Sequence, residues 1–136
     1  MIGVAGFFIF GRENVRLYAS LNPRMAAQAA DIELFVFCSL DIVDEKLAKV
    51  NEMYLGQLYS DQKYKTYGFV TNSGVRMVLV VTINNCTLKD QEIRLLFKKF
   101  HVYYCNTISN PFYSIGKPLQ SKWLIEGSKE LFASMD

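Results

Sequence analysis

Three carboxylates, those of Asp41, Asp44 and Glu45, lie close enough in the sequence to act together. If their segment is helical, the three- and four-residue steps between them place all three on one face. Paired carboxylates can hold a metal ion or act as a general acid and base. No further ligands lie nearby in the sequence, so a solvated face or a contact with a partner protein is the better interpretation. We therefore expect no metal site and no cofactor here.

Asp41 differs from the other two carboxylates because the apolar residues Leu40, Ile42 and Val43 flank it. A carboxylate that approaches apolar surface needs a hydrogen-bond or charge partner to offset its lost hydration. Two kinds of partner remain open at this point. One is a capping group or a cation within this chain, and the other is an Arg, a Lys or a backbone N–H of another protein.

Residues for other catalytic chemistry are few: one histidine, His101, and three widely spaced cysteines, Cys38, Cys86 and Cys105. Without a C-x-x-C pair or a second histidine, a zinc site of the usual type is not expected. An odd number of cysteines fits reduced thiols that serve as small buried hydrophobes. The sequence also lacks the motifs of hydrolases, metalloproteases, phosphate-binding loops and dinucleotide-binding folds. We therefore expect a protein that is not an enzyme.

Length and composition indicate one folded domain without strong charge. The 136 residues are 51% hydrophobic and 21% charged, which excludes intrinsic disorder and predicts a single domain covering residues 1–136. A net charge of +2 is too small for a nucleic-acid-binding surface. No apolar stretch reaches the ~18 residues that a membrane-spanning helix needs.

The pattern of apolar residues predicts the element order β-β-α-β-β-β-α-α. The predicted strands cover residues 2–11, 15–21, 54–59, 64–71 and 75–83, and the predicted helices cover 31–51, 87–106 and 119–135. Two of the strands contain unbroken apolar runs, so the sheet needs cover on both faces. The expected fold class is therefore α/β, in the layered α+β sense. Its five-stranded, mainly antiparallel sheet has one helix on one face and two on the other.

The first helix is more apolar than one buried stripe requires. Its main stripe repeats at three- and four-residue steps, and Phe35, Phe37, Cys38 and Ile42 widen it almost all the way round. A helix that packs on a sheet needs an apolar stripe only a little over 100° wide. We therefore expect apolar residues to remain exposed on this helix as a contiguous patch for a partner protein, of roughly a few hundred Å².

Three stretches of the sequence resemble one known family. They are Ser-Leu-Asp-Ile-Val-Asp-Glu-Lys at 39–46, the pair of segments at 54–59 and 64–73, and Asn-Pro-Phe-Tyr at 110–113. In this order and spacing they closely resemble the "subunit 2-like" proteins of the trafficking protein particle (TRAPP) complex, relatives of sedlin. The resemblance runs from about residue 32 to 115, whereas the segment 21–30 looks unlike the family.

The resemblance implies the longin, or sedlin-like, fold and a non-catalytic assembly subunit of a vesicle-tethering complex. Such a complex activates a Rab-type GTPase by nucleotide exchange in ER-to-Golgi and Golgi transport. The implied location is cytoplasmic and peripheral at ER–Golgi membranes, reached through the complex only. In the family, the Asp of the Ser-Leu-Asp motif lies toward a neighbouring TRAPP subunit, and the resemblance places Asp41 at that position. We expect partner contacts from the first helix at Phe37, Leu40, Asp41, Asp44 and Glu45.

Other functions remain open from the sequence. A SNARE-type longin domain would need a heptad coiled-coil segment after the domain. The small chain of an adaptor complex has a similar fold. A ligand-sensing domain would instead need convergent polar groups in an apolar cleft between sheet and helices.

Overall fold

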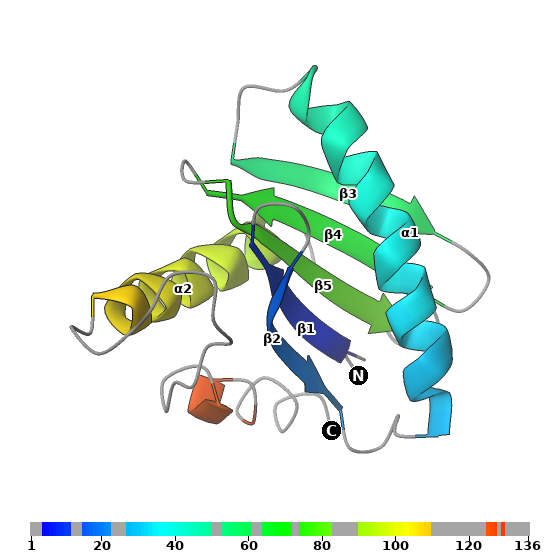
Figure 1. The fold of residues 1–136 in the computed structure, drawn as a ribbon, viewed down its shortest axis with the longest axis horizontal. Helices are drawn as coiled ribbons and strands as arrows, with labels where there is room; N and C mark the ends of the chain where they lie inside the picture. The colour runs from blue at the N-terminus through cyan, green and yellow to red at the C-terminus, as the bar shows by residue number, and fades with distance from the viewer. Residues whose placement is uncertain are drawn as a thin grey trace.

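A computed structural model describes residues 4–11, 15–22, 27–49, 53–60, 64–71, 74–82, 90–109, 125–127 and 129 of the chain. Within these residues it contains seven regular elements (Figure 1). The strands are β1 (Val4–Phe10), β2 (Arg16–Leu21), β3 (Tyr54–Ser60), β4 (Tyr64–Val70) and β5 (Arg76–Thr82). The helices are α1 (Ala29–Leu47) and α2 (Asp90–Ile108).

The five strands form one sheet in the order β2-β1-β5-β4-β3, and every neighbouring pair is antiparallel. The N-terminal strand β1 therefore lies beside β5 in the interior of the sheet, and β2 and β3 are the edge strands. Both β1 and β5 are continuous apolar runs, which suits strands that are covered on both faces. The predicted five-stranded antiparallel sheet is confirmed.

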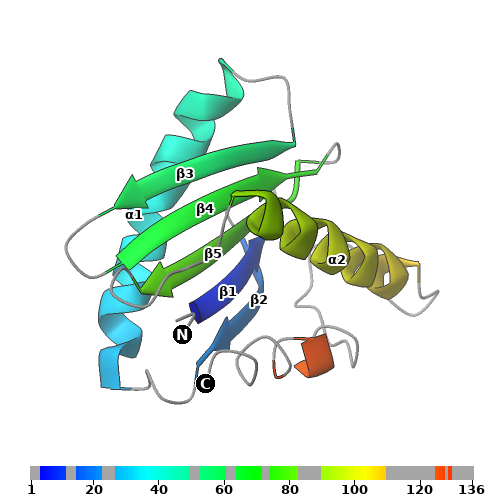
Figure 2. The same cartoon turned by 180° about the vertical axis from the view of Figure 1, so that it is seen from behind.

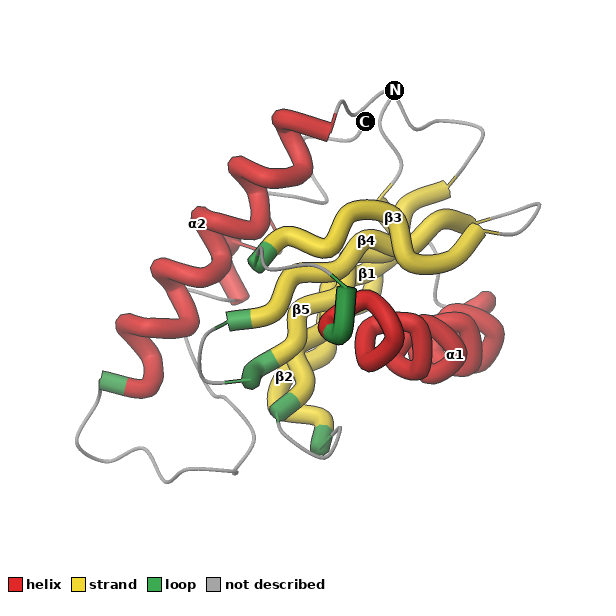
Figure 3. Tube along the Cα trace, turned by 90° about the horizontal axis from the view of Figure 1, so that it is seen from above, coloured by secondary structure: helices red, strands yellow, loops and turns green. Residues whose placement is uncertain are grey.

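Alternate residues of the central strands belong to two separate hydrophobic cores, one on each face of the sheet. Phe7 and Ile9 of β1 point to the α2 side, where the Phe7 ring stacks on that of Phe100 with centroids 4.2 Å apart. Phe8 and Phe10 point to the α1 side. Helix α1 covers one face of the sheet, and α2 lies across the other (Figures 2 and 3). The layered α+β architecture follows directly from this two-sided pattern.

The order of the first seven elements agrees with the order predicted from the sequence, with ends that shift by a few residues. Helix α1 begins at Ala29 and ends at Leu47, four residues before the expected end. Most of the predicted third helix, 119–135, lies outside the described residues, but 125–127 and 129 are helical. Buried Gly127 packs on α2 so closely that a Cβ there would lie 2.7 Å from Cε2 of Tyr103. The Asn-Pro-Phe-Tyr segment at 110–113 is outside the described residues.

Candidate partner-binding site on helix α1

The inner face of α1 packs on the sheet. Its buried residues follow three- and four-residue steps and are Ile32, Phe35, Val36, Ser39, Leu40 and Val43. They contact the alternate residues of β1 and β5 that point to this side, including Phe8 and Val78. Leu40 is only 2% exposed. The expectation that Leu40 contacts a partner is therefore corrected, because its side chain belongs to the core under the helix.

The opposite side of α1 carries a set of exposed residues, which we call the outer face: Leu34, Phe37, Cys38, Asp41 and Glu45. Leu34 is 65% exposed and Phe37 is 54% exposed. The Phe37 ring lies at the border of the core, with its centroid 6.3 Å from that of Phe10. The outer face is apolar toward the N-terminal end of α1 and acidic toward its C-terminal end. A partner that matched it would need apolar and basic groups in the same order.

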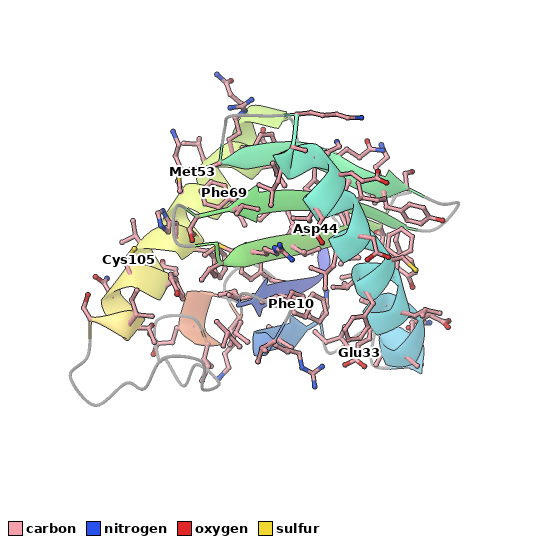
Figure 4. The ribbon with its side chains drawn as sticks, turned by 45° about the horizontal axis from the view of Figure 1, so that its top comes forward. Phe10, Glu33, Asp44, Met53, Phe69 and Cys105 are labelled. Atoms are coloured by element: carbon pink, nitrogen blue, oxygen red, sulfur yellow. The ribbon has the colours of Figure 1, made fainter. Side chains whose placement is uncertain are left out.

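Leu34 was missed as a site residue by the sequence analysis. It lies seven positions before Asp41, which places both on nearly the same line along the helix. That spacing was the available signal, but the surrounding helix is so rich in apolar residues that Leu34 did not stand out. Cys38 was expected to be buried and is exposed, as is Cys105 on α2 (Figure 4).

The three carboxylates of the acidic cluster have different surroundings. The carboxylate of Asp44 pairs with Arg76 of β5, with 2.6 Å between Oδ1 and Nη2 (Figure 4). Asp41 and Glu45 are exposed, and the described part of the chain offers the Asp41 side chain no hydrogen-bond or ion-pair partner. Asp44 is therefore tied to its own sheet, whereas Asp41 is available to another molecule.

One ion pair and two hydrogen bonds of a lysine also connect α1 to the edge strands. Arg16 of β2 pairs with Glu33 at 3.1 Å, and both side chains are about half exposed, so the pair adds little stability. Near the other end, the ammonium group of Lys46 donates to the carbonyl oxygens of Leu55 and Gln57 on edge strand β3. These contacts with β2 and β3 do not involve the residues of the outer face.

Two classes of site find no support in the described geometry. Among the described residues, no group of three or more His, Cys, Asp or Glu side chains is arranged to hold a metal ion. In the same part of the chain, neither helix is long and apolar enough to cross a membrane.

A five-stranded antiparallel sheet between helices, with an exposed apolar and acidic helix face, defines an α+β domain consistent with the longin or sedlin fold. A model of the Sedlin family matches residues 9–134. The chain belongs to this family.

Three relatives match most of the chain. The chain is 40% identical to the "Trafficking protein particle complex subunit 2-like protein" of Xenopus tropicalis, over 84% of this chain and 86% of the relative. It is 34% identical to the protein of the same name in Dictyostelium discoideum, over 76% of each chain. It is also 30% identical to the "Transport protein particle 20 kDa subunit" of Schizosaccharomyces pombe, over 82% of this chain and 75% of the relative.

Proposed function

We propose that this chain is a non-catalytic subunit of a trafficking protein particle complex and joins a neighbouring subunit through the outer face of α1. Relatives that span most of the chain carry the names of subunits of such a complex. The observation that carries the proposal in this chain is the exposure of Leu34 and Phe37 beside Asp41, on a helix whose other face is fully packed.

The energetics of the outer face favour burial in a complex. Full burial of a Leu or Phe side chain contributes about 1.5–3 kcal/mol, and because Leu34 and Phe37 are 65% and 54% exposed, covering each would contribute about half to two-thirds of that. The carboxylate of Asp41 lies one turn beyond Phe37 and would accept a hydrogen bond from a basic or backbone donor of the neighbour. Glu45 would lie at the rim, where a charge guides association more than it strengthens binding.

The family resemblance supports a finer role for the assembled complex. In that role the complex acts on a Rab-type GTPase as a nucleotide-exchange factor, in transport between the ER and the Golgi. The chain would work in the cytoplasm and reach the membrane only as part of the complex. Its own contribution is to hold subunits together, so the GTPase is an indirect partner.

The direct test is affinity purification of the tagged chain from its own cells, followed by mass spectrometry. TRAPP subunits recovered in fixed ratios are the expected result. Recovery of the folded chain without any TRAPP subunit would overturn the proposal.

A matched pair of variants then tests the surface. Leu34→Ser on α1 should reduce recovery of the neighbouring subunit about tenfold or more, because it removes one buried apolar side chain from the contact. Leu95→Ser on α2 is the control, since Leu95 is 64% exposed and lies on the other side of the sheet. Equal loss from both variants, or from neither, would remove the outer face of α1 as the contact.

A further inference from the structure

Two hydroxyl groups are buried in the apolar layer between α1 and the sheet. Ser39 of α1 and Thr66 of β4 are each 0% exposed. Their side-chain oxygens lie 2.7 Å apart, which is a good hydrogen-bond distance. The residues are 27 positions apart in the sequence. They belong to two of the stretches on which the family resemblance was recognised, so those stretches meet at this contact.

The hydroxyl pair is part of a directed chain of hydrogen bonds. The Ser39 hydroxyl donates to the carbonyl oxygen of Phe35, 2.9 Å away. When the Ser39 proton is directed to Phe35, the Thr66 hydroxyl donates to Ser39, because a serine hydroxyl has one proton. The Thr66 oxygen in turn accepts from the backbone N–H of Tyr59 on β3, at 3.2 Å. Every donor in this series of hydrogen bonds has an acceptor, and the series connects α1, β4 and β3.

Apolar side chains surround this series of hydrogen bonds, and the hydrophobic effect that packs them together has no preferred direction. Such packing by itself allows an apolar helix to make small rotations on a sheet at low cost. A hydrogen bond instead requires alignment as well as distance. Among the described residues, the other polar side-chain contacts of α1 to the sheet come from nearer its two ends: Glu33 on one side, and Asp44 and Lys46 on the other. The Ser39–Thr66 bond lies between them, under the middle of the helix.

Rotation of α1 would carry the outer face with it. Successive residues of a helix are about 100° apart around its axis, so even a partial rotation of α1 would change the directions in which Leu34 and Asp41 project. We propose that Ser39 and Thr66 are positioning residues that fix the rotational setting of α1 and thereby present Leu34, Phe37 and Asp41 to the partner. The expected effect on partner binding rests on the proposed function, whereas the expected effect on the setting of α1 does not.

Three substitutions separate positioning from stability. Ser39→Ala removes the hydroxyl and leaves no unpaired donor, because Thr66 can turn to the carbonyl oxygen of Tyr59, 3.4 Å away. Thr66→Val keeps the shape of the side chain and removes its hydroxyl. Thr66→Ser keeps the hydroxyl and removes a methyl group from the core. The first two variants are expected to disturb the setting of α1, and the third to lower the melting temperature only.

The setting of α1 can be measured without any partner. Cys38 on α1 and Cys105 on α2 are exposed. In a Cys86→Ser variant, both can therefore be labelled with nitroxides. Pulsed electron paramagnetic resonance then gives the distance distribution between the two helices. We expect one narrow distribution for the unsubstituted chain and for Thr66→Ser, and a broadened or shifted one for Ser39→Ala and Thr66→Val. Unchanged distributions in all variants would overturn the inference.

Binding is measured with unlabelled variants against the neighbouring TRAPP subunit identified by the purification above, produced as a recombinant protein. Ser39→Ala and Thr66→Val should each weaken binding roughly five- to tenfold, in line with the loss of one net hydrogen bond, while Thr66→Ser binds normally. Affinities that simply follow the melting temperatures would assign the pair a structural role only and overturn the inference. If Leu34→Ser also leaves binding intact, the proposed function fails, and the distance distributions still decide the positioning role.

Discussion

Arg76 and Asp44 join the centre of the sheet to α1 through a contact of 2.6 Å between Nη2 and Oδ1. Asp41 lies three positions earlier on the same helix, yet it is directed to solvent. The two carboxylates therefore have different surroundings, although the sequence places them in one cluster. Asp44 pairs with its own sheet, and Asp41 is exposed.

Replacing each carboxylate should separate their roles. Asp41→Ala is expected to cost ~1–3 kcal/mol of partner binding, because it leaves a donor of the neighbour unpaired in the interface. The melting temperature should stay nearly unchanged, since Asp41 is solvated in the free chain. Asp44→Ala should lower stability by ~1–3 kcal/mol, because the Arg76 side chain is only 16% exposed and loses its carboxylate partner, and should affect binding little.

Thermal unfolding and titration with the neighbouring subunit check both variants, and Glu45→Ala serves as an exposed control. A large fall in melting temperature for Asp41→Ala, with binding intact, would make Asp41 a structural residue.

Leu40 and Phe37 are expected to respond in opposite ways. Leu40→Ala should lower the free energy of unfolding by ~2–5 kcal/mol, because it opens a cavity under α1. Phe37→Ala should change stability much less, since more than half of its side chain surface is exposed, but should weaken partner binding. Chemical denaturation measures the first effect and calorimetric titration the second. Similar destabilisation by both substitutions would mean that Phe37 also belongs to the core.

Lys46 contacts the edge of the sheet. Its ammonium group donates to carbonyl oxygens of β3, which within the described residues is an edge strand. Lys46→Met keeps most of the apolar stem and removes the charge, which should promote edge-to-edge association of the chain. Light scattering over time should show growing assemblies, while Lys49→Met, in the exposed turn after α1, remains like the unsubstituted chain. Identical scattering from both variants would contradict this prediction.

The isolated chain should not accelerate nucleotide release from a Rab-type GTPase. The proposed function gives it an assembly task, and the sequence carries no motif of a catalytic protein. A fluorescence assay of nucleotide release, with the assembled complex as the positive control, measures this directly. Acceleration by the purified chain alone, comparable to that of the complex, would show that it acts on the GTPase itself.

Much of the fold was predictable from local pattern. The unbroken apolar runs of β1 and β5 require a sheet covered on both faces, and the alternation of helix and strand patterns predicts the order of the elements. The surplus of apolar residues on α1 also predicted that some of them stay exposed, as Leu34 and Phe37 do. Individual site residues were harder to place, because Leu34 and Leu40 have the same side chain and lie on the same helix. The periodicity of a helix that is apolar almost all round does not choose between them.

The sequence by itself therefore determined the fold class, the two-sided sheet and the helix with excess apolar surface, because each follows from residue types a few positions apart. Only the tertiary structure decided that Leu34 faces outward and Leu40 inward. It also decided that β1 lies beside β5, that Asp44 is paired with Arg76, and that Ser39 meets Thr66. These are contacts between distant segments. Their geometry depends on how α1 settles on the completed sheet, and no local pattern contains that information.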